Sequence, residues 1–204
     1  GRKEQFIAEL KLQGLTARKA KAEVDLSVDR LIYYAGWADK YQQVFSAVNP
    51  VASSHFNFSI LEPTGVVAIL APEESGLLGL VSNLAPAIAG GNTAIALASE
   101  SRPLSAISFA EVLHSSDVPA GVVNILTGHK EELASQFASH MDVNAVIYCD
   151  GDKAAAEDIQ TRAAENLKHV ISRVGVDWAM DDSQDPYRIR DTQEVKTTWH
   201  PIGG

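Results

Sequence analysis

The chain has 204 residues, 46% of them hydrophobic, which suits a single domain with a sizeable core. Its 26 acidic and 17 basic residues give a formal net charge of −9, so neither nucleic acid nor an anionic membrane surface is expected as a partner. There is no apolar run long enough for a bilayer and no signal-peptide pattern, and the one cysteine suits a reducing compartment, so we expect a cytoplasmic protein.

The first sixty residues predict helices followed by an antiparallel arm. Apolar residues recur at three-to-four spacing over residues 3–45, with a break at Gly14 and with Thr16 as the cap of the second helix. Apolar and polar residues then alternate around Asn49 and Pro50, a pattern typical of two strands joined by a turn. We assign residues 42–62 to this arm.

From Leu61 onward, strand and helix patterns alternate. Short apolar runs predict buried strands at residues 66–71, 93–98, 122–126 and 143–149. The segments between and after them predict helices at residues 75–89, 103–115, 129–139 and 152–167. Continuous apolar strands joined by helices indicate a parallel sheet covered on both faces, so the sequence predicts a doubly wound, Rossmann-like α/β fold.

The last thirty residues have a different character. Residues 176–191 are acidic, polar and aperiodic, which indicates a connector. Residues 192–202 alternate with a period of two, so they predict a half-buried strand that has no obvious partner nearby. An unpaired strand of this kind pairs with another chain, folds back onto an edge of its own sheet, or is disordered.

Several segments together resemble the aldehyde dehydrogenase superfamily. The segments that carry the resemblance are VDRLIYYAGWADKY (28–41), EPTGVV (62–67), LAPAIAGGNT (84–93), VPAGVVNILTG (118–128) and SHMDV (139–143). QEVKTT (193–198) is similar to the family's C-terminal strand, which pairs with a neighbouring subunit. Family members carry a whole catalytic domain where this chain has only residues 176–191. The chain therefore resembles the truncated, non-catalytic C-terminal copy of two-copy aldehyde dehydrogenases and of bifunctional proline-catabolism enzymes.

The resemblance also implies that the catalytic groups are missing. The family's nucleophilic cysteine belongs to the absent domain, and Cys149 ends a predicted buried strand, where it is interpreted as a small hydrophobic residue. Arg173 stands at the position of the general base, and an arginine cannot accept a proton. Glu74 stands at the position of the oxyanion donor, and its carboxylate would repel a developing oxyanion. No catalytic residue is expected in this chain.

The cofactor positions that the resemblance implies are also altered. Leu97 replaces the lysine that reaches the adenine ribose, and Glu100 matches an acid that binds the ribose hydroxyls. Glu100 is therefore the one candidate cofactor contact, as a vestige. Asp150 and Asp152 bring negative charge to the turn that takes the pyrophosphate, and we interpret them as helix caps. No cofactor is expected, beyond NAD bound at low affinity.

Two other groups of polar residues lack the arrangement of a site. Six histidines have no metal-ligand spacing, so no metal is expected. Glu73 and Glu74 adjoin the predicted helix 75–89, and because neighbouring helical residues point in different directions they do not form an acid–base pair. We interpret them as first-turn acids that favour the helix dipole.

These observations predict a non-catalytic assembly domain. Residues 1–175 would form a fold like the family's cofactor domain, residues 176–191 would replace the catalytic domain, and residues 192–204 would contain a pairing strand. Residues 42–62 and 192–202 would bind a second copy, giving a homo-oligomer, or an active aldehyde dehydrogenase copy. One alternative is a residual NAD(P)-binding module of an aldehyde oxidoreductase. Another is an active dehydrogenase, which would need catalytic groups from another chain.

Overall fold

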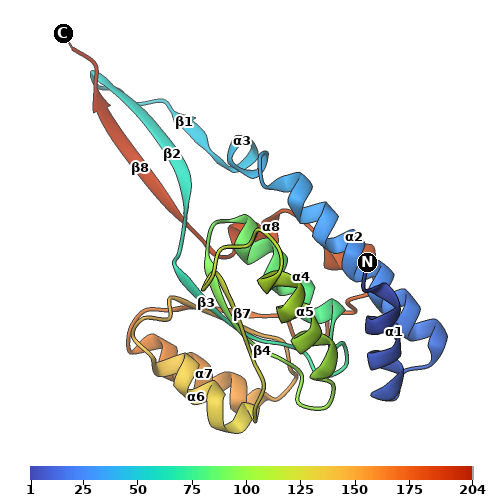
Figure 1. Cartoon of the computed structure of the whole chain (residues 1–204). Helices are drawn as coiled ribbons and strands as arrows, with labels where there is room; N and C mark the ends of the chain where they lie inside the picture. Colours follow the sequence, from blue (N-terminus) through green and yellow to red (C-terminus); the bar gives the residue numbers. More distant parts are fainter. Residues whose placement is uncertain (204) are drawn as a thin grey trace.

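Two separate β-sheets organise the computed structural model, which describes residues 1–203 (Figure 1). The larger sheet has five parallel strands in the order β5-β4-β3-β6-β7. Its strands are β3 (Val66–Leu70), β4 (Thr93–Leu97), β5 (Val123–Leu126), β6 (Ala145–Tyr148) and β7 (His169–Ser172). The chain moves outward from β3 in one direction through β4 and β5, and then returns beside β3 to continue through β6 and β7. The predicted doubly wound α/β fold is confirmed.

Helices cover both faces of this sheet. The crossover helices are α4 (Leu78–Ala89), α5 (Leu104–His114), α6 (Lys130–Ser139) and α7 (Lys153–Ala164). Val67 and Ile69 pack with residues of α4 and α5, whereas Ala68 and Leu70 pack with residues of α6 and α7. Successive strand residues point to opposite faces, and here both faces are buried. This double burial explains why these strands are continuous apolar runs in the sequence.

Three helices precede the sheet: α1 (Lys3–Leu12), α2 (Ala17–Trp37) and α3 (Tyr41–Phe45). Gly14 has a φ of +98°, a conformation that glycine adopts readily, and it separates α1 from α2. The side chain of Thr16 accepts a hydrogen bond from Lys19 N at 3.3 Å, so the predicted cap is confirmed. The long helix α2 packs against α4. Within residues 1–203, every helix is too short or too polar to cross a membrane.

The smaller sheet forms an arm that projects from the body (Figure 1). It contains β1 (Ala47–Asn49), β2 (His55–Pro63) and β8 (Gln193–Pro201), with β2 in the centre. β8 pairs antiparallel with β2 along its whole length, from His55 opposite Pro201 to Pro63 opposite Gln193. Of the alternatives above, this C-terminal strand folds back within its own chain, onto β2 of the arm. Its partner lies far away in sequence, so the local pattern could not reveal it.

The segment 176–191 is more than a polar connector. It contains a short 3₁₀ helix, Asp181–Ser183, and α8 (Tyr187–Arg190), and it buries Trp178 and Ile189. The buried Arg30 of α2 donates through Nη2 to Trp178 O at 3.0 Å and to Ser183 Oγ at 2.8 Å. Tyr34, one turn later, donates to Asp185 O at 3.3 Å. The acidic composition of residues 176–191 does not indicate this docking, because the residues that anchor the segment, Arg30 and Tyr34, lie on α2.

Candidate functional site

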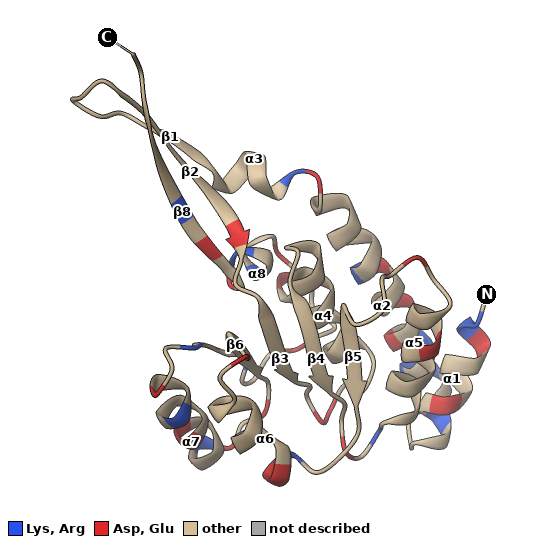
Figure 2. Cartoon of the chain, turned by 60° about the vertical axis from the view of Figure 1, so that its left-hand side comes forward, with Lys and Arg blue, Asp and Glu red and all other residues tan. Residues whose placement is uncertain are grey.

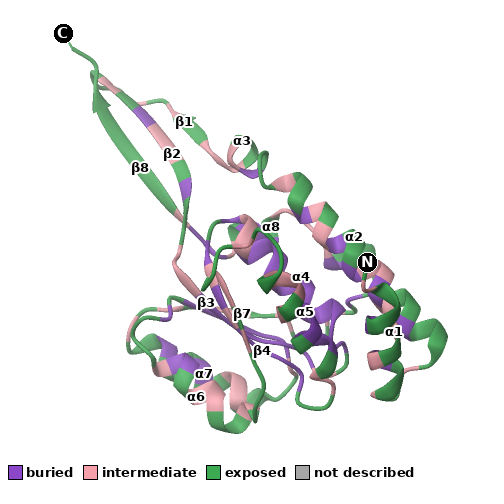
Figure 3. Ribbon diagram, in the orientation of Figure 1, coloured by how far each residue is buried: buried purple, intermediate pink, exposed green. Residues whose placement is uncertain are grey.

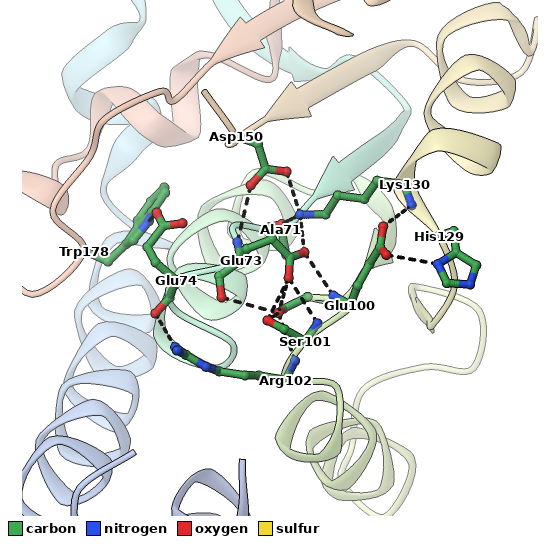
Figure 4. A network of polar contacts seen from close by, with 11 residues as sticks. Ala71, Glu73, Glu74, Glu100, Ser101, Arg102, His129, Lys130, Asp150 and Trp178 are labelled. Carbon is green, nitrogen blue, oxygen red and sulfur yellow. Dashed lines mark hydrogen bonds and ion pairs between the residues drawn. The ribbon is translucent and has the colours of Figure 1, made fainter. Parts of the chain in front are cut away.

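Four loops meet at the carboxyl ends of the central strands (Figure 4). In doubly wound sheets, ligands bind outside the carboxyl ends of the strands, at the point where the strand order reverses. Here that point lies between β3 and β6, whose following loops carry Glu73 and Asp150. The loop after β4 carries Glu100, and the loop after β5 leads into Lys130 at the start of α6. This is therefore the candidate site of the fold.

Lys130 occupies the centre of this crevice. Its Nζ lies 2.6 Å from Glu73 Oε1, 2.6 Å from Asp150 Oδ2 and 2.5 Å from the carbonyl oxygen of Ala71. An ammonium group has three hydrogens to donate, so all three have an acceptor here. The side chain is only 14% exposed. Lys130 is not predicted from the sequence, because a lysine at the start of a helix gives no signal of its own.

Glu73 joins Lys130 to the loop after β4. Its carboxylate accepts hydrogen bonds from Glu100 N at 3.0 Å, from Ser101 N at 3.1 Å and from the Ser99 hydroxyl at 2.9 Å. Burial acts to raise the pKa of Glu73, but Lys130 and these donors outweigh it and lower the pKa to about 2. Glu73 is therefore held ionised by the groups around it.

Asp150 is the second carboxylate against Lys130, and it also accepts a hydrogen bond from Glu73 N at 3.3 Å. Burial raises the pKa of Asp150, and Lys130 only partly opposes this. The interpretation of Asp150 as a helix cap is wrong. Asp152 alone caps α7, accepting from Ala154 N at 2.9 Å and from Ala155 N at 3.4 Å, so that part of the prediction is confirmed.

The interpretation of Glu73 and Glu74 as first-turn acids is also wrong. The helix α4 begins only at Leu78, so both glutamates lie in the preceding loop. Glu23 of α2 satisfies the start of α4 instead, because its Oε1 accepts from Leu77 N at 3.0 Å and from Leu78 N at 3.2 Å. An acid from a distant helix therefore replaces the local one.

Glu100, the candidate cofactor contact, already has partners within the chain. His129 Nδ1 donates to Glu100 Oε2 at 3.0 Å, and the backbone N–H of Lys130 donates to Oε1. The pKa of Glu100 is lowered, first by the Lys130 N–H and then by His129. The pKa of His129 is raised in turn by the same hydrogen bond and charge. Glu100 thus binds the first turn of α6.

Glu74 and Arg173, at the positions that the resemblance assigns to catalytic groups, have structural contacts, and Cys149 and Leu97 are buried. Glu74 Oε1 accepts from Trp178 Nε1 at 3.3 Å, and Arg173 forms an ion pair with Asp191. Cys149 is buried, and burial raises the pKa of its thiol, which disfavours the reactive thiolate. Leu97 is fully buried in the core beneath α6 and α7. Within the part of the chain that the structure describes, no group of three acidic, histidine or cysteine side chains is placed to hold a metal ion.

We expect Glu73→Gln to lower the free energy of unfolding by about 1–2 kcal/mol at pH 7, a figure reduced for the partial exposure of this side chain. The pKa of Glu73 falls from 4.5 to about 2 on folding, so its charged form stabilises the fold above pH 4.5 and this stabilisation is lost as the pH falls toward 2. The difference in the free energy of unfolding between wild type and variant should therefore be less than half as large at about pH 3 as at pH 7. Urea unfolding at several pH values measures it.

The raised pKa of Asp150 acts with the opposite sign, since its contribution to stability is lost as the pH rises. Burial is the first cause of this shift and remains in the variant, although the charge of Glu73, a smaller cause, is removed. Glu131→Gln, on the exposed first turn of α6, is the matched control and should change stability by less than about 0.5 kcal/mol at every pH. A gap for Glu73→Gln that is equally large at pH 7 and pH 3 would contradict this account.

Comparison with known proteins identifies related sequences and structures. A family model described as "Aldehyde dehydrogenase family" matches residues 2–180. An aldehyde dehydrogenase of Emericella nidulans is 33% identical over 156 residues, which cover 76% of this chain and 31% of that protein. The mitochondrial aldehyde dehydrogenase of Sus scrofa is 33% identical over 174 residues, which cover 79% of this chain and 33% of that protein.

Solved structures agree with these sequence matches. PnpE from Pseudomonas sp. WBC-3 superimposes with a TM-score of 0.80 and 28% identity, covering 85% of this chain and 35% of that one. The NAD⁺ complex of an aldehyde dehydrogenase from Bacillus cereus gives a TM-score of 0.79 and 27% identity, with the same coverage of 85% and 35%. The chain thus spans about a third of the length of the relatives it matches, and β8 lies outside the matched residues 2–180.

Proposed function

Because this chain belongs to the aldehyde dehydrogenase family, we propose that it is a non-catalytic member of that family with a structural role in assembly. The observation that carries the proposal is the ion cluster around Lys130. It fills, with the chain's own charges, the crevice that binds a ligand in folds of this type. The contacts of Glu74 and Arg173 support the same conclusion, since both side chains serve the packing of the chain.

The proposal assigns a role to each part of the chain. Residues 1–175 provide the fold of a cofactor domain, and residues 176–191 stand in place of a catalytic domain. The docking of this segment through Arg30 and Tyr34 supports its being a built part of the fold. Residues 192–204 contain β8, which completes the arm with residues 42–62.

The arm supports a role in association because both of its faces expose large apolar side chains. Most of β8 is exposed (Figure 3). Val48, Phe56 and Ile60 lie on one face, and Val195 and Trp199 lie on the other. Monomeric proteins rarely expose apolar side chains in contiguous groups, and such groups mark sites of protein interaction. The proposed partners are a second copy, giving a homo-oligomer, and an active aldehyde dehydrogenase copy.

A residual NAD(P)-binding module is the second candidate function. It is favoured by Glu100, which lies at the rim of the crevice, and by the NAD⁺ complex of the Bacillus cereus relative. A dinucleotide would have to displace Lys130 from two carboxylates and would meet their negative charge with its own phosphates. We therefore propose that NAD binds with a dissociation constant in the millimolar range or weaker.

We expect the intact chain to self-associate at tens of micromolar, and Trp199→Asp to dissociate it. Trp199 is 57% exposed, so an aspartate there adds charge to the association surface without opening the core. Multi-angle light scattering gives the mass, and thermal unfolding checks that the variant still folds. This variant is a cleaner test than removal of β8, which would leave one side of β2 without a neighbouring strand.

Met141→Asp is the matched control. Met141 is an exposed apolar residue on the α6–β6 loop, away from the arm, and its variant should keep the wild-type mass. A wild-type chain that stays monomeric at these concentrations and does not bind an aldehyde dehydrogenase either would contradict the assembly proposal.

A further inference from the structure

We propose that a halide ion such as chloride binds between α2 and the segment 176–191, where Arg30 and Arg188 hold it. The proposal goes beyond the assembly role and does not depend on it. It follows from the burial of these two arginines, from their unpaired N–H groups and from the position of the carboxylates around them.

Both arginines are buried where the segment packs against α2. Arg30 lies on α2 and is 3% exposed, and Arg188 lies on α8 and is 7% exposed. Figures 1 and 2 both place α8 at the base of the arm, beside the body of the protein. Arginine is almost never buried to this extent unless its charge has a partner. Two such arginines in one interface therefore require an account of their charge.

Aromatic residues bring the two side chains to one place. Arg30 Nη2 donates to Trp178 O at 3.0 Å, and the guanidinium of Arg188 lies 5.4 Å from the centre of the Trp178 ring. Burial lowers the pKa of both arginines, and Tyr34, which lies near both, opposes this in each case. After burial, the charges of Arg173 and Arg30 lower the pKa of Arg188 further. Like charges thus meet in this interface, and an anion among them would be stabilised.

Most donors of the two guanidinium groups are unused. Arg30 pairs only through Nη2, which donates to Trp178 O and to Ser183 Oγ. Among residues 1–203, no group accepts a hydrogen bond from Nε or Nη1 of Arg30, or from Nε or Nη1 of Arg188. A buried charged group that lacks a hydrogen bond costs more than a neutral one. These nitrogen atoms are therefore available to an anion.

The nearby carboxylates leave these donors free. Asp185 Oδ2 lies 4.0 Å from Arg188 Nε, beyond hydrogen-bonding distance, and the aspartate side chain is 42% exposed. Asp191 forms its ion pair with a third arginine. Asp181 is exposed and acts on Arg30 only as a nearby charge. The acids of the segment therefore weaken the positive potential without supplying the missing acceptor.

The free donors favour a halide over a carboxylate or a phosphate. A guanidinium binds those larger groups most strongly through two parallel N–H groups, and both of the edges that offer such a pair include Nη2. In Arg30 this nitrogen already serves Trp178 and Ser183. The remaining Nε and Nη1 donors point in different directions, so they do not grip one carboxylate together. A halide is a single atom that accepts from any direction, and it needs the least room.

Thermal unfolding of the intact chain tests the site. Sodium chloride is varied at constant ionic strength, with sodium gluconate as the replacement salt. We expect the midpoint to rise by about 4–8 °C between about 1 and 300 mM chloride and then to level off, as for a site with a dissociation constant of about 10 mM.

Arg188→Met should abolish this rise. The variant removes one of the two cations, and the side chain it replaces donates no hydrogen bond from Nε or Nη1 within residues 1–203. At the lowest chloride concentration it should unfold at the wild-type temperature or above, because it replaces an unbalanced buried charge. Arg190→Met, at the exposed arginine of the same helix, is the matched control and should keep the full rise. A rise of equal size in Arg188→Met and wild type would overturn the proposal.

Crystals of the wild-type chain grown in bromide provide a test that needs no variant. Bromide scatters anomalously, so a peak is expected within hydrogen-bonding distance of the guanidinium groups of both Arg30 and Arg188. An ordered water in this place would give no anomalous peak and no chloride dependence, and would overturn the proposal. A larger rise of the midpoint with phosphate than with chloride, lost in Arg188→Met, would overturn the assignment to a halide and identify an oxyanion site.

Discussion

Incubated with NAD or NADP and a panel of aldehydes, the purified chain is expected to produce no reduced cofactor above the buffer control. Oxidation of an aldehyde through a covalent intermediate needs a nucleophile, a base and a donor for the oxyanion. Here Cys149 is buried with a raised pKa, Arg173 is paired with Asp191, and Glu74 presents a carboxylate. Loss of a base or of an oxyanion donor typically costs about 10²–10⁴ in rate, and the combined loss places turnover below detection.

Absorbance at the wavelength of the reduced cofactor is the measurement, and a catalytically complete relative assayed alongside is the control. Turnover that disappears in Cys149→Ser would contradict the expectation, because it would identify that thiol as a nucleophile. Calorimetric titration with NAD separates a failure of chemistry from a failure of binding. A dissociation constant in the low micromolar range would favour the residual cofactor-binding module.

Trp178→Ala is expected to lower the free energy of unfolding by about 3–5 kcal/mol. Trp178 is 3% exposed, and its indole N–H donates to Glu74. The guanidinium of Arg188 lies 5.4 Å from the centre of the Trp178 ring. The carbonyl oxygen of Trp178 accepts a hydrogen bond from Arg30. Removal of the ring leaves a cavity and strips a buried arginine of its aromatic contact. Urea unfolding at a fixed protein concentration measures the change.

Met180→Ala is the matched control, because Met180 lies two residues further along the same segment and is 55% exposed. It should change stability by less than about 0.5 kcal/mol. A cost below about 1 kcal/mol for Trp178→Ala would show that residues 176–191 are the loose connector that their composition indicates.

The fold was predictable where the decisive interactions are local. Gly14 and Thr16 mark a helix boundary by their own backbone and side chain, and the runs at 66–71 and 93–98 are apolar because both faces of the sheet are covered. The start of α4 was misplaced because its cap, Glu23, belongs to another helix. The partner of β8 was missed for the same reason, since alternation indicates a strand but not which strand it pairs with.

The candidate site shows the same limit. The family resemblance predicts Glu100 as a cofactor contact, and in the structure this residue lies at the crevice. The direction of its carboxylate is set by hydrogen bonds from His129 and Lys130, which the sequence does not reveal. Lys130 itself had no recognisable spacing to Glu73 or Asp150. Its role exists only because the ends of β3, β5 and β6 meet at one edge of the sheet.

The pairing of β2 with β8 also sets the timing of folding during synthesis. Ser59 and Thr197, which face each other across the two strands, are 138 residues apart in the chain. At about 5–20 residues per second, the ribosome needs roughly 7–28 seconds to make the partner of β2 after β2 itself has emerged. During this interval β2 has only the short β1 beside it, with Phe56 and Phe58 on an open edge. During synthesis the nascent arm therefore presents an open edge that can aggregate with other nascent chains, and a chaperone that covers this edge would protect it.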